Sequence, residues 1–279
     1  MRRALPTALL ATVVLLPALA VAGPADDAMQ RGEQLLSQGK FREALSAYAT
    51  AVQADRENRE NVSRYMMLRR VVQLRQQFQQ ETNDARLAYL ARALRQFYMS
   101  HDLHEEALAL DKRVHRQLRD TRSALALADT QLEMGRNSEA LATLSDLPNE
   151  QQNTSTRALR AIALSRLGKK EEAKRVADDV ELAEGSGLGI TYAVARMHAA
   201  TGQPEKAVGA LSRFFESVPP SQQPAFREVA RNCPEFGELT RDTAFQTALE
   251  TESKVSESEC SGGKSCAGCP MRGNCPGSK

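Results

Sequence analysis

The residues best suited to chemistry in this sequence are four cysteines near its C-terminus. They are Cys260, Cys266, Cys269 and Cys275. Four thiols at this spacing can form two disulfides, hold one thiophilic ion such as Zn²⁺ or Cu⁺, or cycle between thiol and disulfide. Zinc sites usually bring two close cysteine pairs together, and only Cys266 and Cys269 form such a pair. The spacing leaves all three chemistries open.

The histidines are the next candidates for chemistry. His101 and His104 are three residues apart, a spacing that on a helix brings two imidazoles together as metal ligands. They straddle an expected turn, and no acid or cysteine is placed to complete a site. His115 and His198 stand alone. No phosphate-binding loop, nucleophile elbow or zinc-protease signature occurs, so we expect no enzyme.

The N-terminus indicates the compartment. Arg2 and Arg3 precede an uncharged stretch rich in Ala, Leu and Val, and small residues end it at Ala20 and Ala22. This pattern predicts a signal peptide over residues 1–22 and a periplasmic or secreted protein. The alternative is an uncleaved membrane anchor, but Pro17 lies where a signal peptide bends towards its cleavage site. Export favours disulfides among the terminal cysteines.

Charge and composition exclude some classes of partner. The chain has 37 Lys and Arg against 35 Asp and Glu, so removal of two arginines with the leader leaves 35 against 35. A formally neutral chain has no global attraction to nucleic acid. No later apolar run reaches the roughly 20 residues of a membrane span, so we expect no stable span after cleavage. The absence of Trp, with Ala and Leu dominant, favours helices packed through small residues.

A spacing of five residues from Gly to Ala recurs along the chain and organises its middle. It is found at Gly39 to Ala44, Gly135 to Ala140, Gly168 to Ala173 and Gly202 to Ala207, and the last three glycines are 33 and 34 residues apart. A weaker copy runs from Asp102 to Ala107. Glycine suits a helix end in the left-handed conformation, and two helices with two short turns occupy about 34 residues.

This pattern resembles the tetratricopeptide repeat, whose consensus has small residues in both helices and a Gly-x-aromatic-x-x-Ala turn. The first copy matches best, with Gly32, Gly39, Phe41, Ala44 and Tyr48 at consensus positions. The resemblance covers about residues 25–58 and 88–220. It implies an all-α solenoid of helical hairpins, each of which buries its apolar face by stacking on the next.

The domain organisation follows from these patterns. Residues 23–220 form the repeats, irregular over 58–88, where residues 58–80 read as one long helix without a turn signature. Residues 221–250 form a helical cap, in which Cys233 before Pro234 is predicted to be a buried free thiol. Residues 251–279 are a polar linker and a short Cys-rich tail, which we expect to be disordered unless sulfur chemistry orders it.

The concave face of such a solenoid is lined by the first helix of each hairpin. The residues predicted to bind a partner there are Arg92, Gln96, Asp129, Tyr192 and Arg196. The Lys and Asn set with which some tetratricopeptide domains clamp a carboxylate is missing, whereas a mixture of Arg, Gln and Tyr suits an extended or helical peptide.

Two functional hypotheses remain. The first is an exported scaffold that binds a protein or peptide on its concave face. The second is a metal-handling or thiol-redox protein in which the tail is the active element, with Zn²⁺ or Cu⁺ as possible cofactors, and the repeats recruit its target. The fold by itself names no ligand.

Overall fold

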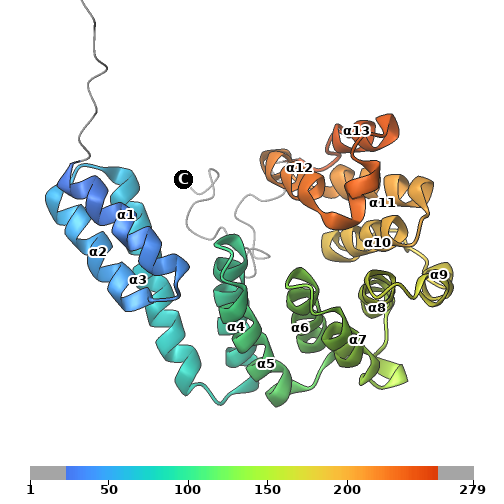
Figure 1. The fold of residues 1–279 in the computed structure, drawn as a ribbon, viewed down its shortest axis with the longest axis horizontal. Coiled ribbons are helices and arrows are strands. Elements are labelled where there is room, and N and C mark those ends of the chain that lie inside the picture. Colours follow the sequence, from blue (N-terminus) through green and yellow to red (C-terminus); the bar gives the residue numbers. More distant parts are fainter. Residues whose placement is uncertain (1–22, 257–279) are drawn as a thin grey trace, which may run out of the picture. The chain divides into compact units, whose positions relative to one another are not determined.

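The computed structural model describes residues 23–256, most of which are helical (Figure 1). They form thirteen α-helices, three short 3₁₀ helices and no strand. The predicted all-α class is therefore confirmed. The predicted signal peptide and the four cysteines of the tail lie outside the described residues.

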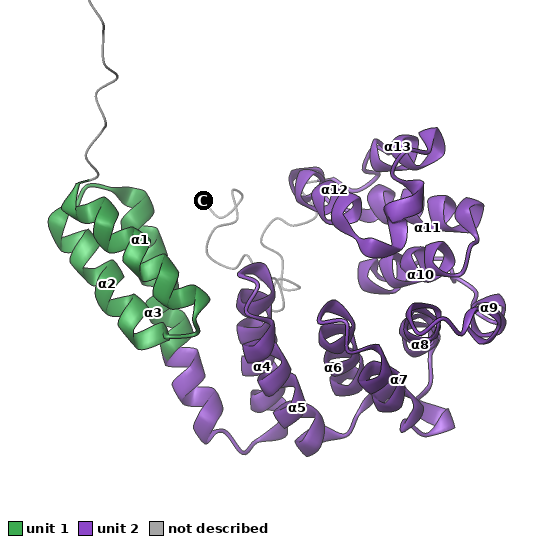
Figure 2. Ribbon diagram, in the orientation of Figure 1, with its two compact units in different colours: residues 1–72 green, residues 73–279 purple. Residues whose placement is uncertain are grey.

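The chain divides into two compact units, residues 1–72 (unit 1) and residues 73–279 (unit 2) (Figure 2). Unit 1 contains the hairpin of α1 (Pro24–Ser37) and α2 (Phe41–Ala54). The boundary between the units falls within α3 (Arg59–Gln80), which confirms the predicted long helix without a turn. Its buried residues include Leu68, Val71 and Phe78.

Unit 2 continues with four hairpins, in each of which a short turn joins two consecutive helices. They are α4 (Asp84–Ser100) with α5 (His104–Leu118), α6 (Thr121–Glu133) with α7 (Asn137–Ser145), α8 (Thr154–Arg166) with α9 (Lys170–Asp178), and α10 (Leu188–Ala200) with α11 (Pro204–Ser217). A 3₁₀ turn, η1 (Asn149–Gln151), precedes α8. The hairpins stack in order, because α5 packs against α6, and α8 packs against α6, α7 and α10. This stacking is the predicted helical-hairpin solenoid.

Every hairpin turns at a residue in the left-handed conformation. The four glycines predicted for the turns have φ between 70° and 76°, and Asp102 in the weak copy has φ 55°. In each turn the next residue donates its N–H to the carbonyl five residues earlier, as Lys40 does to Leu35 at 2.9 Å. These bonds satisfy carbonyl groups that a helix end leaves without a partner.

The alanine of each repeat lies where the second helix meets the first. All five alanines are at most 1% exposed: Ala44, Ala107, Ala140, Ala173 and Ala207. A larger side chain at these positions would push the paired helices apart, because protein cores leave few voids. The turn and the alanine therefore act together, since one reverses the chain and the other allows close contact.

The region predicted as a cap, residues 221–250, is also helical. It contains η2 (Pro220–Gln222), α12 (Gln223–Asn232), η3 (Pro234–Leu239) and α13 (Thr243–Leu249). Phe236 and Phe245 are fully buried with ring centroids 5.5 Å apart, and α13 packs on α11. This segment covers the apolar end of the stack, which an open-ended solenoid requires.

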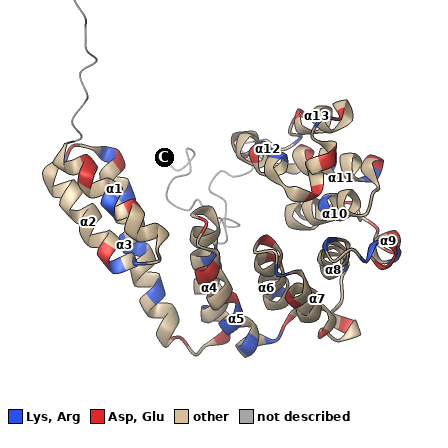
Figure 3. Ribbon diagram, viewed as in Figure 1, with Lys and Arg blue, Asp and Glu red and all other residues tan. Residues whose placement is uncertain are grey.

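The surface of the described residues mixes both signs of charge (Figure 3). At the start of α9, residues 169–172 are exposed, and Lys169 and Glu172 form an ion pair at 3.9 Å. Within residues 23–256 no helix combines the length and the apolar character that a membrane span requires.

Candidate functional site

Unit 2 contains a groove of about 1190 Å³. The first helices of four successive hairpins, α4, α6, α8 and α10, all contribute to it, and α12 and the start of η3 complete the lining. This matches the concave face predicted from the repeat register. The second helices have no such access, except that His104 begins α5 beside the turn.

Apolar and small side chains form much of the groove wall. The larger apolar residues are Met99, Leu125, Leu159, Leu188, Ile190 and Val229, and Val229 is 51% exposed. Alanines, glycines and serines separate them: Ser100, Ala126, Ser155, Gly187, Gly189, Ala193 and Ala225. Small residues let a bound backbone approach closely, while the larger ones offer apolar contact.

The structure brings together three of the five residues predicted to bind a partner. Asp129, Tyr192 and Arg196 line the groove. Arg92 and Gln96 are exposed on α4 but are not among its lining residues. Arg196 has a role that the repeat register does not indicate, because its side chain is only 7% exposed and is held by carboxylates from other helices.

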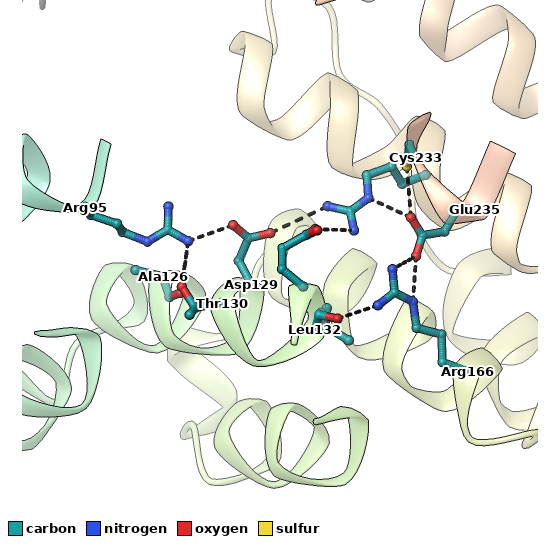
Figure 4. A network of polar contacts seen from close by, with 10 residues as sticks. Arg95, Ala126, Asp129, Thr130, Leu132, Arg166, Cys233 and Glu235 are labelled. Atoms are coloured by element: carbon teal, nitrogen blue, oxygen red, sulfur yellow. Dashed lines mark hydrogen bonds and ion pairs between the residues drawn. The ribbon is translucent and has the colours of Figure 1, made fainter. Parts of the chain in front are cut away.

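One end of this network centres on Arg95 of α4. Its Nε lies 3.0 Å from Asp111 Oδ2 on α5, and its Nη2 lies 2.8 Å from Asp129 Oδ2 on α6. Thr130 donates to the same Asp111 oxygen at 2.7 Å. Arg95 therefore ties three consecutive helices together, and Figure 4 shows its contacts with Asp129 and Thr130 on α6.

The other end centres on Glu235 of η3, whose side chain is 2% exposed. Arg196 Nε lies 3.0 Å from Glu235 Oε2, and Arg166 Nε on α8 lies 2.7 Å from Glu235 Oε1 (Figure 4). Arg166 also donates to the carbonyl of Leu132, in the last turn of α6, at 2.6 Å. Glu235 thus joins α8 and α10 to the cap.

Asp129 connects these two ends. Its Oδ2 binds Arg95, while its Oδ1 lies 3.5 Å from Arg196 Nη1. Arg196 Nη2 also contacts Glu133 Oε1 at 3.2 Å, one helical turn further along α6. A continuous set of ion pairs therefore runs from α4 through α6 to α10 and η3. Three of its residues, Asp129, Glu133 and Arg196, line the groove, and we call this network the groove floor.

The electrostatics explain how these charges are kept in a poorly hydrated place. Burial opposes the charge of Arg196, but Glu235 and the other carboxylates outweigh it and raise the pKa of this guanidinium. Burial likewise opposes ionisation of Glu235, yet Arg196 and Arg166 lower the pKa of its carboxyl below the ordinary value. Each charge is kept because its partners compensate for lost hydration.

Cys233 is buried, as predicted, and its thiol donates to Glu235 Oε2 at 3.0 Å. Burial, followed by the charge of Glu235, raises the pKa of this thiol to about 12. A thiol with that pKa is almost entirely protonated near neutral pH and is a poor nucleophile. Cys233 therefore serves here as a hydrogen-bond donor in the groove wall.

The histidines do not converge on one point. His101 stacks on Phe97 at 4.1 Å between ring centroids, while His104 lies in the groove wall with Nε2 3.8 Å from Asp102. His115 bonds Ser123, and burial lowers the pKa of His198. Among residues 23–256 no cluster of three or more His, Cys, Asp or Glu side chains could hold a metal ion.

Sequence reasoning missed most of the network. The missed residues are Arg95, Asp111, Glu133, Arg166 and Glu235. A weak signal existed for Glu235, because it stands between Pro234 and Phe236 in the segment identified as a cap. The partners of Arg196 are distant in sequence, since Glu133 lies 63 residues before it, Asp129 still further, and Glu235 39 residues after it, so no local pattern relates them.

Comparisons with known proteins add little to this description. No protein-family model matches the chain, and a comparison with curated proteins gave no match. A similar solved structure is that of a tetratricopeptide repeat protein from Parabacteroides merdae ATCC 43184, with 12% identity and a TM-score of 0.35 over 84% of this chain and 82% of that one. Similarity at this level carries no argument about function. The tetratricopeptide-type solenoid rests on the turns and buried alanines of the chain itself.

Proposed function

We propose that this chain is a non-catalytic scaffold that binds a protein or peptide partner in the groove of unit 2. The observation that carries this proposal is the groove itself. It has a volume of about 1190 Å³ and extends along the first helices of four consecutive hairpins. Solenoids bind extended partners on such surfaces.

The proposal includes export from the cytosol, which the sequence of residues 1–22 supports. In an oxidising compartment the tail cysteines favour disulfides over free thiols. Cleavage before Gly23 would leave α1 intact, because that helix begins at Pro24. N-terminal sequencing of the protein isolated from its natural host checks the cleavage, and an N-terminus at Met1 would contradict it.

Site-specific photo-crosslinking tests the groove. A photoreactive residue replaces Val229, which is 51% exposed in the groove, or Leu167, which is 36% exposed but is not a lining residue. We expect Val229 to crosslink to a defined partner, identified by mass spectrometry, and Leu167 to give no such adduct. Equal adducts from both positions, or none from Val229, would contradict the proposal.

A truncated chain separates this function from the tail-centred alternative. Truncation after Ser256 is preferable to truncation after Glu250, because Gln223 Nε2 donates to Thr251 O at 3.1 Å and Lys254 N donates to Glu216 O at 2.7 Å. We expect the truncated chain to keep the Val229 crosslink. Loss of the crosslink with unchanged helicity would favour the tail as the active element.

A further inference from the structure

The charged residues that line the groove are mostly acidic. Asp129 and Glu133 lie one turn apart on α6, Asp102 lies at the α4–α5 turn, and Glu228 lies on α12. Among the described lining residues, Arg196 is the only Lys or Arg. The formal count is thus four negative charges and one positive charge.

Among the exposed side chains of the groove, the excess of negative charge is larger than this formal count indicates. The side chain of Arg196 is only 7% exposed and contacts three carboxylates, so it has little capacity left for a ligand. In contrast, the side chains of Asp102 and Glu133 are 94% and 33% exposed. Glu228 is exposed and forms no ion pair within residues 23–256. A ligand in the groove therefore meets mainly negative charge.

The floor itself does not neutralise this charge. Its guanidinium groups are outnumbered by its carboxylates, three against four, which leaves one formal negative charge. The groups are Arg95, Arg166 and Arg196 against Asp111, Asp129, Glu133 and Glu235. Among these carboxylates, Glu133 contacts only one guanidinium group, and its side chain is partly exposed. A cationic group of a ligand can therefore bind at Glu133.

Apolar side chains surround these acids. Val229 lies one position after Glu228, while Leu125 lies one turn before Asp129 on the same face of α6. Resting on the proposed function, we infer that the groove selects a basic amphipathic peptide segment, in which Lys or Arg side chains alternate with apolar ones. The alkyl stems of Lys and Arg would pack on the apolar wall while their charged ends reach the carboxylates.

The same arrangement disfavours an acidic segment. A carboxylate on the ligand would lose hydration beside Asp129, Glu133 and Glu228 without gaining a free cation, and like charges brought together at an interface are repelled. The acidic side chains of the groove therefore discriminate between ligands by the charge of the ligand side chains.

Fluorescence anisotropy with three designed peptides tests this inference on the full chain. The peptides share one length and one set of Leu and Ala residues, and the remaining positions are all Lys, all Gln or all Glu. The groove variant combines Glu133→Gln with Glu228→Gln. Its matched control combines Glu171→Gln with Glu172→Gln, two exposed acids on α9 outside the groove.

We expect the Lys peptide to bind about tenfold more tightly than the Gln peptide, and the Glu peptide to bind most weakly. The groove variant should lose about tenfold in affinity for the Lys peptide while its circular dichroism is unchanged, and the control should stay within about twofold. Added salt should weaken the Lys peptide most.

Three results would overturn the inference. Equal binding of the Lys and Gln peptides would show that charge does not select, although the groove would still bind peptides as proposed. Equal losses in the groove variant and the control would show attraction to the general surface. Absence of binding by all three peptides would reject a basic segment, and the Val229 crosslink would then decide separately whether the groove binds any partner.

Discussion

The α1–α2 hairpin of unit 1 and the groove floor of unit 2 are both places where helices pack closely, but different forces hold them. In the hairpin, Gly32 faces the ring of Tyr48, and Ala44 and Ala51 are fully buried. In the groove floor, arginines and carboxylates from separate hairpins meet. The hairpin depends on close steric fit, and the groove floor depends on charge compensation. The hairpin is thus sensitive to added volume, and the floor to the loss of one charged partner.

The largest effect on stability is expected when the carboxylate of Glu235, which accepts hydrogen bonds in the groove floor, is removed. Glu235→Ala leaves the guanidinium groups of Arg196 and Arg166 buried without their shared carboxylate. We expect the free energy of unfolding to fall by about 3–5 kcal/mol, because Arg166 loses its carboxylate partner while Arg196 keeps only its contacts with Asp129 and Glu133, and a buried charge with too few partners is costly. Urea denaturation followed by circular dichroism measures it. The control is Glu228→Ala, which removes an exposed acid at the rim and should change the free energy of unfolding by no more than about 0.5 kcal/mol. A similarly small change for Glu235→Ala would contradict a stabilising role of the groove floor.

The next largest effect is expected from a substitution that adds volume to the α1–α2 hairpin. A Cβ on Gly32 would lie 2.3 Å from two ring carbons of Tyr48, so Gly32→Ala should destabilise by about 1–3 kcal/mol. The matched control is Gly209→Ala in α11, where a Cβ meets nothing within 4 Å. That change should instead stabilise by about 0.5–1 kcal/mol through helix propensity.

A double variant checks that the ring is the cause. Tyr48→Leu removes the ring atoms that the added Cβ would meet, so Gly32→Ala should cost less in that background than in the wild type. Equal costs in the two backgrounds would place the strain elsewhere, for example against the carbonyl of Ala44 at 3.4 Å.

Measuring stability over a range of pH tests the contribution of charge to the groove floor. Because the pKa of Glu235 is below its ordinary value of 4.5, its ion pairs stabilise the fold above that value and are lost as the pH falls through the folded pKa. The difference in unfolding free energy between the wild type and Glu235→Gln should stay constant from about pH 7 to about pH 5 and narrow only below the ordinary carboxyl range. Narrowing that begins near neutral pH would indicate a raised pKa instead.

The smallest expected effect concerns Cys233. Its thiol is a third partner of Glu235, but a sulfur donor is weak and the two guanidinium groups remain when it is removed. Cys233→Ala should therefore cost about 1 kcal/mol or less in urea denaturation. A cost close to that of Glu235→Ala would mean that the thiol, rather than the arginines, holds this carboxylate.

Local patterns in the sequence predicted the repeats well, because their determinants lie close together along the chain. A residue able to adopt positive φ, followed five residues later by a buried alanine, defines each hairpin turn, and this held even for Asp102. The long helix α3 was predicted from its apolar stripe and the absence of such a turn. Of the five residues that the repeat register assigns to the concave face, Asp129, Tyr192 and Arg196 line the groove, whereas Arg92 and Gln96 do not.

Only the tertiary structure decided what those residues do. Arg196 looks from the sequence like an exposed contact for a partner, but stacking brings Glu133 and Glu235 against it from 63 residues before and 39 residues after. Arg166 meets Glu235 across 69 residues. Helix periodicity and turns are set by neighbours within a few residues, whereas the partner of a buried charge depends on how hairpins stack. The sequence therefore determined the solenoid and its concave face, and the stacking alone determined which charges of that face remain free.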